Sequence, residues 1–365
     1  MNLSRTAMLT GCTIIAALCA LTLSSFAAET AFGTAPELDC GSPSDIHDGW
    51  VIGSAEQQGL DPALLCAMGK GVADGKLPNV DSIVVVRHGV LVYERYFAYP
   101  HQLAFDATTK HVGNSMTKSV VSLLVGIAID RGLIKDLDAP IFPYFPENAD
   151  LRAPEKDRIT LRHLLTMSAG LNSTRAPGIS FEYDDGETEL IGAILQRVSG
   201  KPVNVLAQEN IFTPLGIKDV AWYDGTVTGG FAKSSSGLSL RPRDWAKIGQ
   251  LVLNGGVWEG KQIVPASWIA QSTTAQIKAR EPFSYGFQWW IGRSLNEDRA
   301  IEWTAALGFN AQKTIIIPDL DSVVVFNASR QSARMIAPEI ELLDKYVLPA
   351  ILKHQSKSPS SRPAH

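Results

Sequence analysis

Hydrophobic and polar positions change their period along the chain. Near both ends they form short runs rich in β-branched and aromatic residues. Residues 82–87 and 90–97 lie on either side of His88-Gly89 and predict a β-hairpin. Residues 314–317 and 322–326 predict a second hairpin close to the C-terminus. The chain therefore places its clearest strand signals in its terminal segments.

Between these hairpins the period is helical, with Pro and Gly marking the ends of segments. Helices are predicted from Asp61-Pro62 onward and over residues 115–131, 161–167, 187–198, 203–211, 243–253 and 332–353. The segment 115–131 is apolar nearly all round, which is typical of a buried helix.

The pattern predicts an α+β fold, with a central, mostly antiparallel sheet built from both terminal segments and flanked by helices. We expect one domain over residues 28–353. Its sheet subdomain comprises about 55–132 and 235–353, and a helical subdomain of about 133–234 is inserted between them. The Ser-, Pro- and Lys-rich tail, 354–365, is predicted to be disordered.

The first 27 residues have the pattern of a secretory signal peptide, which predicts a periplasmic or secreted protein. Arg5 is followed by the apolar stretch 11–26, and Ser25-Phe26-Ala27 offers a small-x-small cleavage site. The alternative is an uncleaved anchor. An apolar stretch of this length that also carries Thr and Ser is short for a bilayer, so no stable membrane insertion is expected after cleavage.

Composition narrows the function classes. With 365 residues, 45% of them hydrophobic, the chain can bury a sizeable core. Its formal net charge of −4 and the lack of any basic run argue against nucleic-acid binding. The seven His are scattered and no Cys-x-x-Cys or His-Glu-x-x-His occurs, so neither a metal site nor another cofactor is expected. The pattern does not indicate an oligomeric state.

Two cysteines remain once the signal peptide is set aside. In an exported protein Cys40 and Cys66 could form one disulfide, worth about 3 kcal/mol for a loop of this size. Two unlinked thiols are the alternative.

Candidate chemistry begins with Ser115 and Lys118, which share one face of the predicted buried helix, one turn apart. If Asn114 caps this helix, Ser115 lies in its first turn with a free N–H that can bind an oxyanion. Burial and the positive helix end would favour the neutral, proton-accepting form of Lys118. Chance alone supplies about one Ser-x-x-Lys in a chain of this composition, so the pair needs support from elsewhere.

That support comes from an ordered set of phrases along the chain. They lie at residues 59–62, 115–118, 162–171, 181–183, 214–216, 285–290 and 318–320. Together they resemble the penicillin-recognising serine hydrolases, within their class C β-lactamase-like branch. That branch also contains esterases and a 6-aminohexanoate-dimer hydrolase. The resemblance covers nearly all of the chain after the signal peptide and implies a β-lactamase/DD-peptidase-like fold.

The second motif of that family, Tyr-x-Asn, corresponds here to Tyr183-Asp184-Asp185. The resemblance implies that Tyr183 exchanges protons with the serine and the leaving group. Asp185 stands in the substrate-binding Asn position. An ionised carboxylate there can accept a hydrogen bond but cannot donate one to a substrate, and it can instead cap the following helix.

The third motif, Lys-Thr-Gly, corresponds to Ala306-Leu307-Gly308. Gly308 is kept where substrate approaches the strand edge, but Ala306 removes the cation that handles a substrate carboxylate. This departure favours neutral esters or amides. By position, the resemblance implies that the backbone N–H of Phe309 is the second oxyanion donor, beside that of Ser115.

Three aromatic residues complete the expected substrate site. Tyr285, Trp289 and Trp290 lie in a predicted strand over residues 285–291 and could wall an apolar acyl-binding cleft. They could equally be the core of the sheet.

The expected function is an exported serine hydrolase of a small-molecule ester or amide. Ser115 would form the acyl-enzyme, and Lys118 and Tyr183 would transfer protons. Alternatives are a β-lactamase or D-alanyl-D-alanine carboxypeptidase, and a catalytically silent protein that binds cell-wall peptides. A Ser-His-Asp hydrolase is disfavoured because the chain contains no Gly-x-Ser-x-Gly. The identity of the substrate does not follow from the sequence.

Overall fold

The computed structural model describes residues 40–77, 80–99, 104–147, 153–223, 232–296, 299–329 and 338–355. These residues belong to one compact unit that begins at Leu38. The expected signal peptide, 1–27, lies outside the described residues, as does the tail from residue 356 onward. Among the helices that the structure describes, none is long and apolar enough to cross a membrane.

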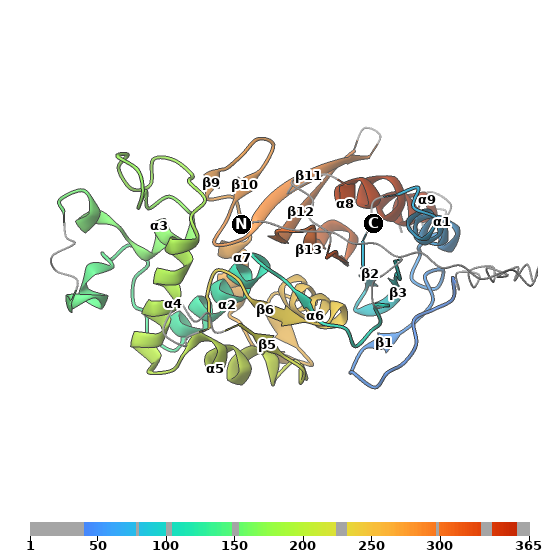
Figure 1. The fold of residues 1–365 in the computed structure, drawn as a ribbon, viewed down its shortest axis with the longest axis horizontal. Coiled ribbons are helices and arrows are strands. Elements are labelled where there is room, and N and C mark those ends of the chain that lie inside the picture. Colours follow the sequence, from blue (N-terminus) through green and yellow to red (C-terminus); the bar gives the residue numbers. More distant parts are fainter. Residues whose placement is uncertain are drawn as a thin grey trace, which may run out of the picture. The chain divides into compact units, whose positions relative to one another are not determined.

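A nine-stranded sheet is the centre of the fold (Figure 1). In spatial order its strands are β1 (Val51–Ile52), β3 (Val90–Tyr96), β2 (Ser82–Arg87), β14 (Ser322–Asn327), β13 (Gln312–Ile317), β12 (Arg299–Gly308), β11 (Trp290–Asn296), β10 (Ser284–Tyr285) and β9 (Ile277–Lys278). All neighbours are antiparallel except β1 and β3. The predicted sheet of both terminal segments is confirmed, because β2 pairs with β14.

Both predicted hairpins are present, and the first shows why its turn forms. His88 and Gly89 adopt positive φ angles of 53° and 73°, which the tight β2–β3 connection requires. The second hairpin joins β13 to β14 through a short 3₁₀ turn, Pro318–Leu320.

Helices cover both faces of this sheet. Those of the first half of the chain are α1 (Pro62–Ala73), α2 (Met116–Asp130), α3 (Leu161–Leu165), α4 (Asp185–Ser199) and α5 (Val203–Ala207). Later come α6 (Pro242–Leu253), α7 (Ala266–Ser272), α8 (Pro338–Leu342) and α9 (Leu348–Gln355). In Figure 1, α3, α4 and α5 gather around α2, whereas α1, α8 and α9 lie together at the other end of the molecule, above β2 and β3 in this view.

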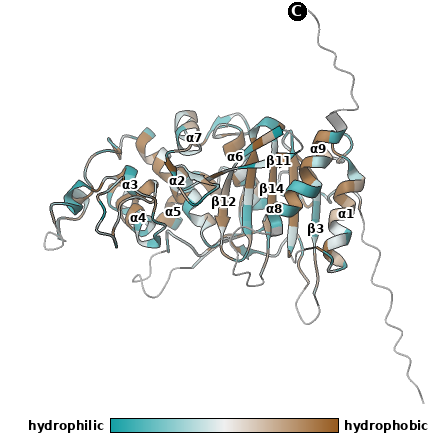
Figure 2. Cartoon of the chain, turned by 90° about the horizontal axis from the view of Figure 1, so that it is seen from above, coloured by the Kyte–Doolittle hydropathy of each residue, from teal (hydrophilic) through white to brown (hydrophobic). Residues whose placement is uncertain are grey.

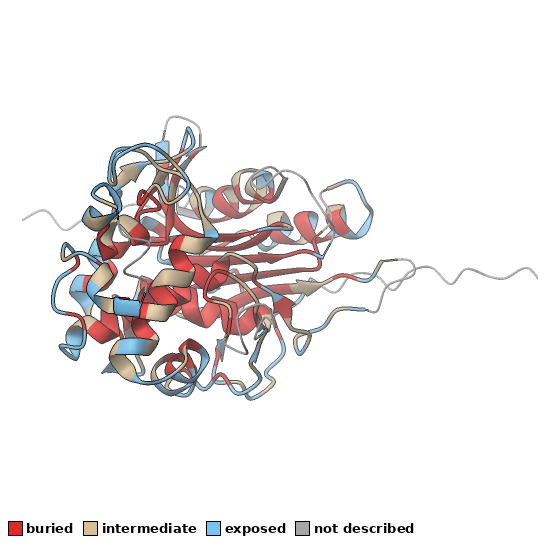
Figure 3. Ribbon diagram, turned by 60° about the vertical axis from the view of Figure 1, so that its left-hand side comes forward, coloured by how far each residue is buried: buried red, intermediate tan, exposed pale blue. Residues whose placement is uncertain are grey.

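Alternation along the strands divides the interior into two cores. Val84 and Val86 of β2 face a core that contains α2 and α6, while Ile83 and Val85 face one that contains α1 and α9. Figure 2 shows hydrophobic residues concentrated in the sheet and on the helix faces turned toward it. Figure 3 shows the central strands of the large sheet mostly buried and the peripheral loops mostly exposed.

The helix predicted over 115–131 is α2, and its side chains are buried from Met116 to Ala128. A helix buried on all sides can hold a polar residue only where other groups provide partners. This makes its N-terminal end, where Ser115 and Lys118 lie, an unusual position for an amine.

Three short pairings complete the fold. β4 (His111–Val112) pairs with β6 (Leu238–Leu240), which also pairs with β5 (Ala221–Trp222). β7 (Val257–Trp258) and β8 (Lys261–Gln262) form a separate two-stranded sheet. The β4–β6 pairing leads directly into Ser115, so it fixes the approach of the chain to the candidate nucleophile.

One strand prediction was wrong. Residues 285–291 are not continuous, because β10 ends at Tyr285 and β11 begins at Trp290 after a tight turn. The N–H of Gly286 donates to the carbonyl of Trp289, and Gln288 has a φ of +63°. A Cβ on Gly286 would lie 2.2 Å from the carbonyl oxygen of Ser272, so only glycine fits this turn.

The C-terminal helix is confirmed where it can be followed. α8, a π-helical turn (Leu343–Val347) and α9 run without a break from residue 338 to Gln355. Its predicted start, 332–337, lies outside the described residues. The expected disulfide is also present, and Cys40 is bonded to Cys66 of α1.

Candidate active site

Ser115 lies immediately before the first residue of α2, at the position that caps the helix. The prediction that Asn114 is the cap was wrong, because Asn114 has a left-handed φ of +49°. The N–H of Ser115 donates to no group among the described residues. It is one of the N-terminal donors that a helix leaves free, and it is therefore available to an oxyanion.

The side chain of Lys118 is 1% exposed and lies between three oxygen atoms. Its Nζ donates to Ser115 Oγ at 3.2 Å, to Asp185 Oδ1 at 2.7 Å and to the carbonyl of Ser235 at 2.8 Å. All three ammonium hydrogens therefore have acceptors. The structure brings the predicted serine and lysine into direct contact.

The two acidic residues after Tyr183 divide two tasks between them. Asp184 caps α4, because its Oδ1 accepts from the N–H of Gly186 at 2.7 Å. Asp185 is the first residue of α4 and pairs with Lys118. The suggestion that Asp185 caps the helix is thus corrected, and the residue in the family's Asn position contacts the candidate base.

Tyr183 contacts Lys118 through its ring. The Nζ lies 5.0 Å from the ring centroid, a cation–π distance. The ring stacks on Trp290 at 5.8 Å. The Tyr183 hydroxyl is buried and has no hydrogen-bond partner among the described residues. The structure therefore places Tyr183 beside the base without joining its hydroxyl to Ser115.

Tyr285, Trp289 and Trp290 are all buried, at 1%, 0% and 3% exposure. Tyr285 and Trp290 pack with Phe181 behind the ring of Tyr183. Trp289 belongs to the core on the opposite side. The arrangement puts these three residues in the core and makes two of them a support for Tyr183.

The end of β12 supplies the second predicted oxyanion donor. A Cβ on Gly308 would lie 2.1 Å from the carbonyl oxygen of Gly113, so glycine is required where strand and helix meet. The N–H of Phe309, the next residue, donates to no described group, and Phe309 as a whole is 48% exposed. Ala306 is buried in β12 and brings no charge.

A second carboxylate holds the loop on which Lys118 depends. Glu189 of α4 accepts from the N–H of Ser234 at 3.0 Å and from that of Ser235 at 2.9 Å. A Cβ on Gly192, one turn further along α4, would collide with the Ser234 hydroxyl at 1.8 Å. α4 therefore fixes the carbonyl of Ser235, and with it one partner of Lys118.

Burial raises the pKa of two further groups near the site, Glu187 and Tyr285. Glu187 is fully buried, and this raises its pKa to about 8, although one oxygen accepts from the N–H of Ala169 at 3.1 Å. Burial likewise raises the pKa of Tyr285 well above its usual value, so its hydroxyl stays protonated. The raised pKa favours the protonated form of Glu187, and Asp185 is the carboxylate in contact with Lys118.

Sequence reasoning missed three participants: the Asn114 amide, the Ser235 carbonyl and Glu189. A backbone carbonyl leaves no signal in a sequence, because every residue has one. For Asn114 the only signal was its position beside Ser115. No cluster of His, Cys, Asp or Glu suited to a metal occurs within the described ranges.

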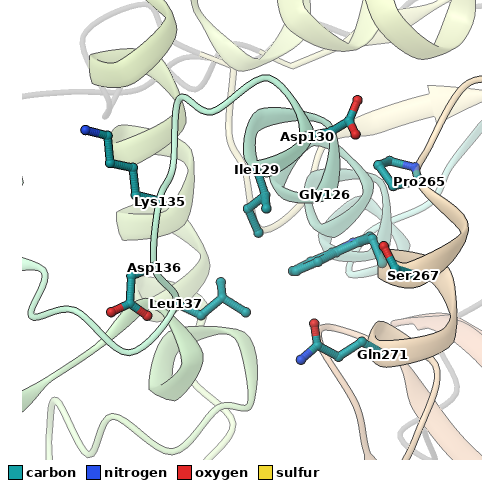
Figure 4. Close-up of a pocket in the computed structure, with 10 residues that line it drawn as sticks. Gly126, Ile129, Asp130, Lys135, Asp136, Leu137, Pro265, Ser267 and Gln271 are labelled. Carbon is teal, nitrogen blue, oxygen red and sulfur yellow. The ribbon is translucent and has the colours of Figure 1, made fainter.

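Figure 4 shows a cavity of about 220 Å³ that is separate from this chemistry. It is lined by Gly126, Ile129 and Asp130 near the C-terminal end of α2, together with residues of α7. Ser115 is at the other end of the helix, and a rise of about 1.5 Å per residue separates the two by more than about 15 Å. The cavity is not part of the candidate active site.

Comparison with known proteins gives the family. The sequence model of the family described as Beta-lactamase matches residues 67–345. This chain belongs to the β-lactamase family. Among curated proteins, the 6-aminohexanoate-dimer hydrolase of Paenarthrobacter ureafaciens is 26% identical in an alignment of length 294 that covers 67% of this chain and 71% of that protein. Esterase EstB of Burkholderia gladioli is 26% identical in an alignment of length 205 that covers 44% of this chain and 52% of the esterase.

Solved structures of two penicillin-binding protein homologues show the same fold. A penicillin-binding protein homologue from Caulobacter crescentus has a TM-score of 0.66 at 17% identity, covering 81% of this chain and 98% of that one. Another, from Pyrococcus abyssi, has a TM-score of 0.63 at 20% identity, covering 80% and 77%. The predicted α+β, β-lactamase/DD-peptidase-like class is confirmed. Hydrolases and esterases among the relatives make this member of the β-lactamase family a serine hydrolase.

Proposed function

We propose that this protein is an exported serine hydrolase that cleaves a neutral ester or amide through an acyl-enzyme on Ser115. The observation that carries the proposal is the position of Lys118, buried between Ser115 Oγ, Asp185 and the Ser235 carbonyl. A buried amine held within 3.2 Å of a serine hydroxyl is the arrangement that activates a nucleophile.

The three partners of Lys118 also direct its proton transfer. After Nζ loses one proton, the carboxylate of Asp185 and the carbonyl of Ser235 still occupy the two remaining N–H groups. The lone pair then faces the third partner, Ser115 Oγ, and can accept its proton as the oxygen attacks the substrate carbonyl. Asp185 and the Ser235 carbonyl thus orient the lone pair of Lys118 Nζ toward Ser115 Oγ.

The rest of the cycle uses groups around this pair. The N–H groups of Ser115 and Phe309 bind the tetrahedral oxyanion, and the bond to the leaving group breaks as that group receives a proton. Tyr183 donates this proton, since its buried hydroxyl has no described partner and such a group gains about 1–3 kcal/mol from finding one. In the second half of the cycle, the Tyr183 oxygen takes a proton from the water that attacks the acyl group. Lys118 returns its proton to Ser115 Oγ as the acyl–oxygen bond breaks, so the acid product leaves and all three groups are restored.

Substrate charge is the point on which the proposal departs from β-lactam chemistry. With Ala306 in β12, the third motif has no cation to bind a substrate carboxylate. The same departure, with Asp185, is what a silent peptide-binding protein would show. The direct contact of Ser115 and Lys118 favours catalysis instead.

The test uses the mature protein with nitrophenyl esters of graded chain length, nitrocefin, a D-Ala-D-Ala peptide and aminohexanoate oligomers. We expect turnover of an ester or amide, slow or absent nitrocefin and peptide turnover, and labelling by a fluorophosphonate probe. Ser115→Ala should lose both turnover and labelling. Ser122→Ala, which removes a buried hydroxyl without a described partner from the same helix, is the matched control.

Each result has a clear meaning. If the folded wild-type protein is not labelled by the probe and does not turn over any substrate, the proposed hydrolase is refuted and the catalytically silent binding protein becomes the better hypothesis. Rapid nitrocefin or D-Ala-D-Ala turnover would make it a β-lactamase or carboxypeptidase. Equal labelling of Ser115→Ala would remove Ser115 as the nucleophile.

Export is supported by the N-terminal pattern and by the Cys40–Cys66 disulfide, a bond typical of oxidising compartments. Fractionation of expressing cells, with the mass of the recovered protein, tests it. A mature mass that lacks about 27 residues is expected outside the cytoplasm, whereas a full-length mass in the cytoplasm would contradict export.

A further inference from the structure

Asn114 links the nucleophile to the far side of the oxyanion site. Its side-chain Nδ2 donates to the carbonyl of Phe309 at 3.0 Å, across 195 positions of sequence. Its backbone is left-handed, with φ +49°. Asparagine tolerates this conformation better than most residues, but glycine tolerates it too. The backbone alone does not call for an amide at this position.

The turn that Asn114 contacts joins β12 to β13 and depends on its surroundings for its conformation. β12 and β13 pair as far as Gly308 and Gln312, and the turn between them contains Asn310 and Ala311, with φ of 60° and 64°. Two consecutive left-handed residues other than glycine are costly, so such a turn persists only where its surroundings hold it. The Asn114 amide holds the turn at Phe309, beside its strained residues.

The position of that contact matters because both oxyanion donors border it. Asn114 immediately precedes Ser115, and its partner Phe309 carries the second free N–H. The close approach of Gly308 to the Gly113 carbonyl brings helix and strand together at the same point. One hydrogen bond therefore connects the residue before the first donor to the residue that carries the second.

We propose that Asn114 is a positioning residue that sets the spacing of the Ser115 and Phe309 N–H groups. This inference rests on the proposed function, in which those two groups bind the oxyanion. The oxyanion exists only in the transition state and intermediate, and its donors must lie about 2.7–3.1 Å from it. Loosening the turn therefore lowers kcat and leaves ground-state substrate binding unchanged.

Two substitutions separate the amide from the backbone angle. Asn114→Gly keeps the left-handed conformation and removes the donor. Asn114→Asp keeps the shape but turns an acceptor toward the Phe309 carbonyl. We expect kcat to fall about tenfold for Asn114→Gly and further for Asn114→Asp, with KM within about twofold of wild type, since loss of an oxyanion donor itself costs about 10²–10³.

A phosphonate inhibitor that mimics the tetrahedral intermediate provides a second readout. Its rate of inactivation should fall by the same factor as kcat for each variant, while the melting temperature stays close to that of wild type. His88→Gly is the matched control, because it also replaces a left-handed residue by glycine, with φ 53°, in a turn between β2 and β3. It should leave kcat unchanged.

Wild-type kcat in Asn114→Gly, whether or not its melting temperature falls, would overturn the inference. So would equal losses in kcat and in 1/KM for both variants, which would indicate loss of substrate binding. A wild-type protein without turnover, or an active Ser115→Ala variant, would instead refute the proposed function. The two failures are therefore distinguishable.

Discussion

Two buried lysine–carboxylate pairs in this protein look alike and do different things. Lys118 pairs with Asp185, and Lys313 of β13 pairs with Glu339 of α8, both at 2.7 Å and with both lysines 1% exposed. Glu339 is 2% exposed, whereas Asp185 is 57% exposed. One pair is sealed between a strand and a helix, and the other opens to solvent through its acid and touches a serine.

The two pairs differ in whether the buried lysine can exchange its proton with a hydroxyl or with a solvent-exposed carboxylate. Burial lowers the pKa of Lys313, but among the described residues its Nζ bonds only to Glu339, which is itself buried, so this pair joins a strand to a helix. At Lys118 the hydroxyl of Ser115 and the solvated carboxylate of Asp185 give the proton a source and an exit. The candidate active site is therefore distinguished by the access of Lys118 to Ser115 and to a solvent-exposed carboxylate, and less by the ion pair itself.

The largest expected effect is on catalysis at the open pair. Lys118→Met should lower kcat/KM for the best ester by about ten-thousandfold, because no other described amine contacts Ser115. Stability should change by less than about 1 kcal/mol, since the remaining carboxylate of Asp185 is solvated. Steady-state kinetics and urea denaturation check the two halves. A variant that keeps a tenth of the wild-type rate would contradict the assignment of the base.

The sealed pair should show the reverse behaviour. Lys313→Met leaves Glu339 charged and buried, and removal of one partner of such a pair costs about 3–5 kcal/mol. Urea unfolding should show this loss, with kcat of the folded fraction unchanged. Lys313→Met combined with Glu339→Leu should recover much of the stability. A large loss of kcat in the folded single variant would mean that the two pairs are not separate in function.

Asp185 permits a finer comparison within the open pair. Asp185→Asn restores the family's amide and keeps an acceptor for Lys118, but it replaces the charge of the ion pair by a neutral dipole. Because a hydrogen bond to a charged group is worth about 1 kcal/mol more than a neutral one, kcat/KM should fall by about fivefold, far less than for Lys118→Met. Steady-state kinetics at a single pH measure the change, and a wild-type kcat/KM would show that the charge of Asp185 does not help to hold the base.

The last prediction concerns the pH dependence of stability and comes from Glu187, the buried acid near the site. The pKa of Glu187 is raised to about 8, so between about pH 4.5 and 8 the folded protein holds a proton that the unfolded chain has released. Stability from this group is complete below about pH 4.5 and is lost as pH rises to about 8. Glu187→Gln should remove that slope, which is at most about 1.4 kcal/mol per pH unit. Melting curves of both proteins from pH 5 to 8 measure it, and parallel slopes would refute it.

Much of the fold followed from local signals. The hairpin at His88-Gly89 and the buried helix α2 could be predicted because period, β-branching and turn residues agree there. The break between β10 and β11 could not, because an aromatic run has the same appearance whether or not a turn interrupts it. That turn depends on a contact between Gly286 and Ser272, which only the folded chain makes.

The sequence predicted those residues of the site whose type and motif indicate a chemical role. Ser115, Lys118 and Tyr183 were identified by motif, and the structure brings them together. Asp184 caps α4 and Asp185 contacts Lys118, but the two residues are adjacent and of the same type. Their spacing in the sequence therefore does not predict which of them takes which position. Asn114 was expected to cap a helix, and a left-handed angle instead sends its amide to Phe309.

The segments that build the site are widely separated along the chain. Lys118 takes partners from residues 185 and 235, and the second oxyanion donor comes from residue 309, at the end of a strand near the C-terminus. A chain that is still being synthesised therefore carries Ser115 and Lys118 before the partners that hold Lys118 and before the second oxyanion donor are in place. Under the proposed mechanism, Ser115 becomes a competent nucleophile only when the end of β12 meets the start of α2, so acyl transfer has to wait until these distant segments have folded together.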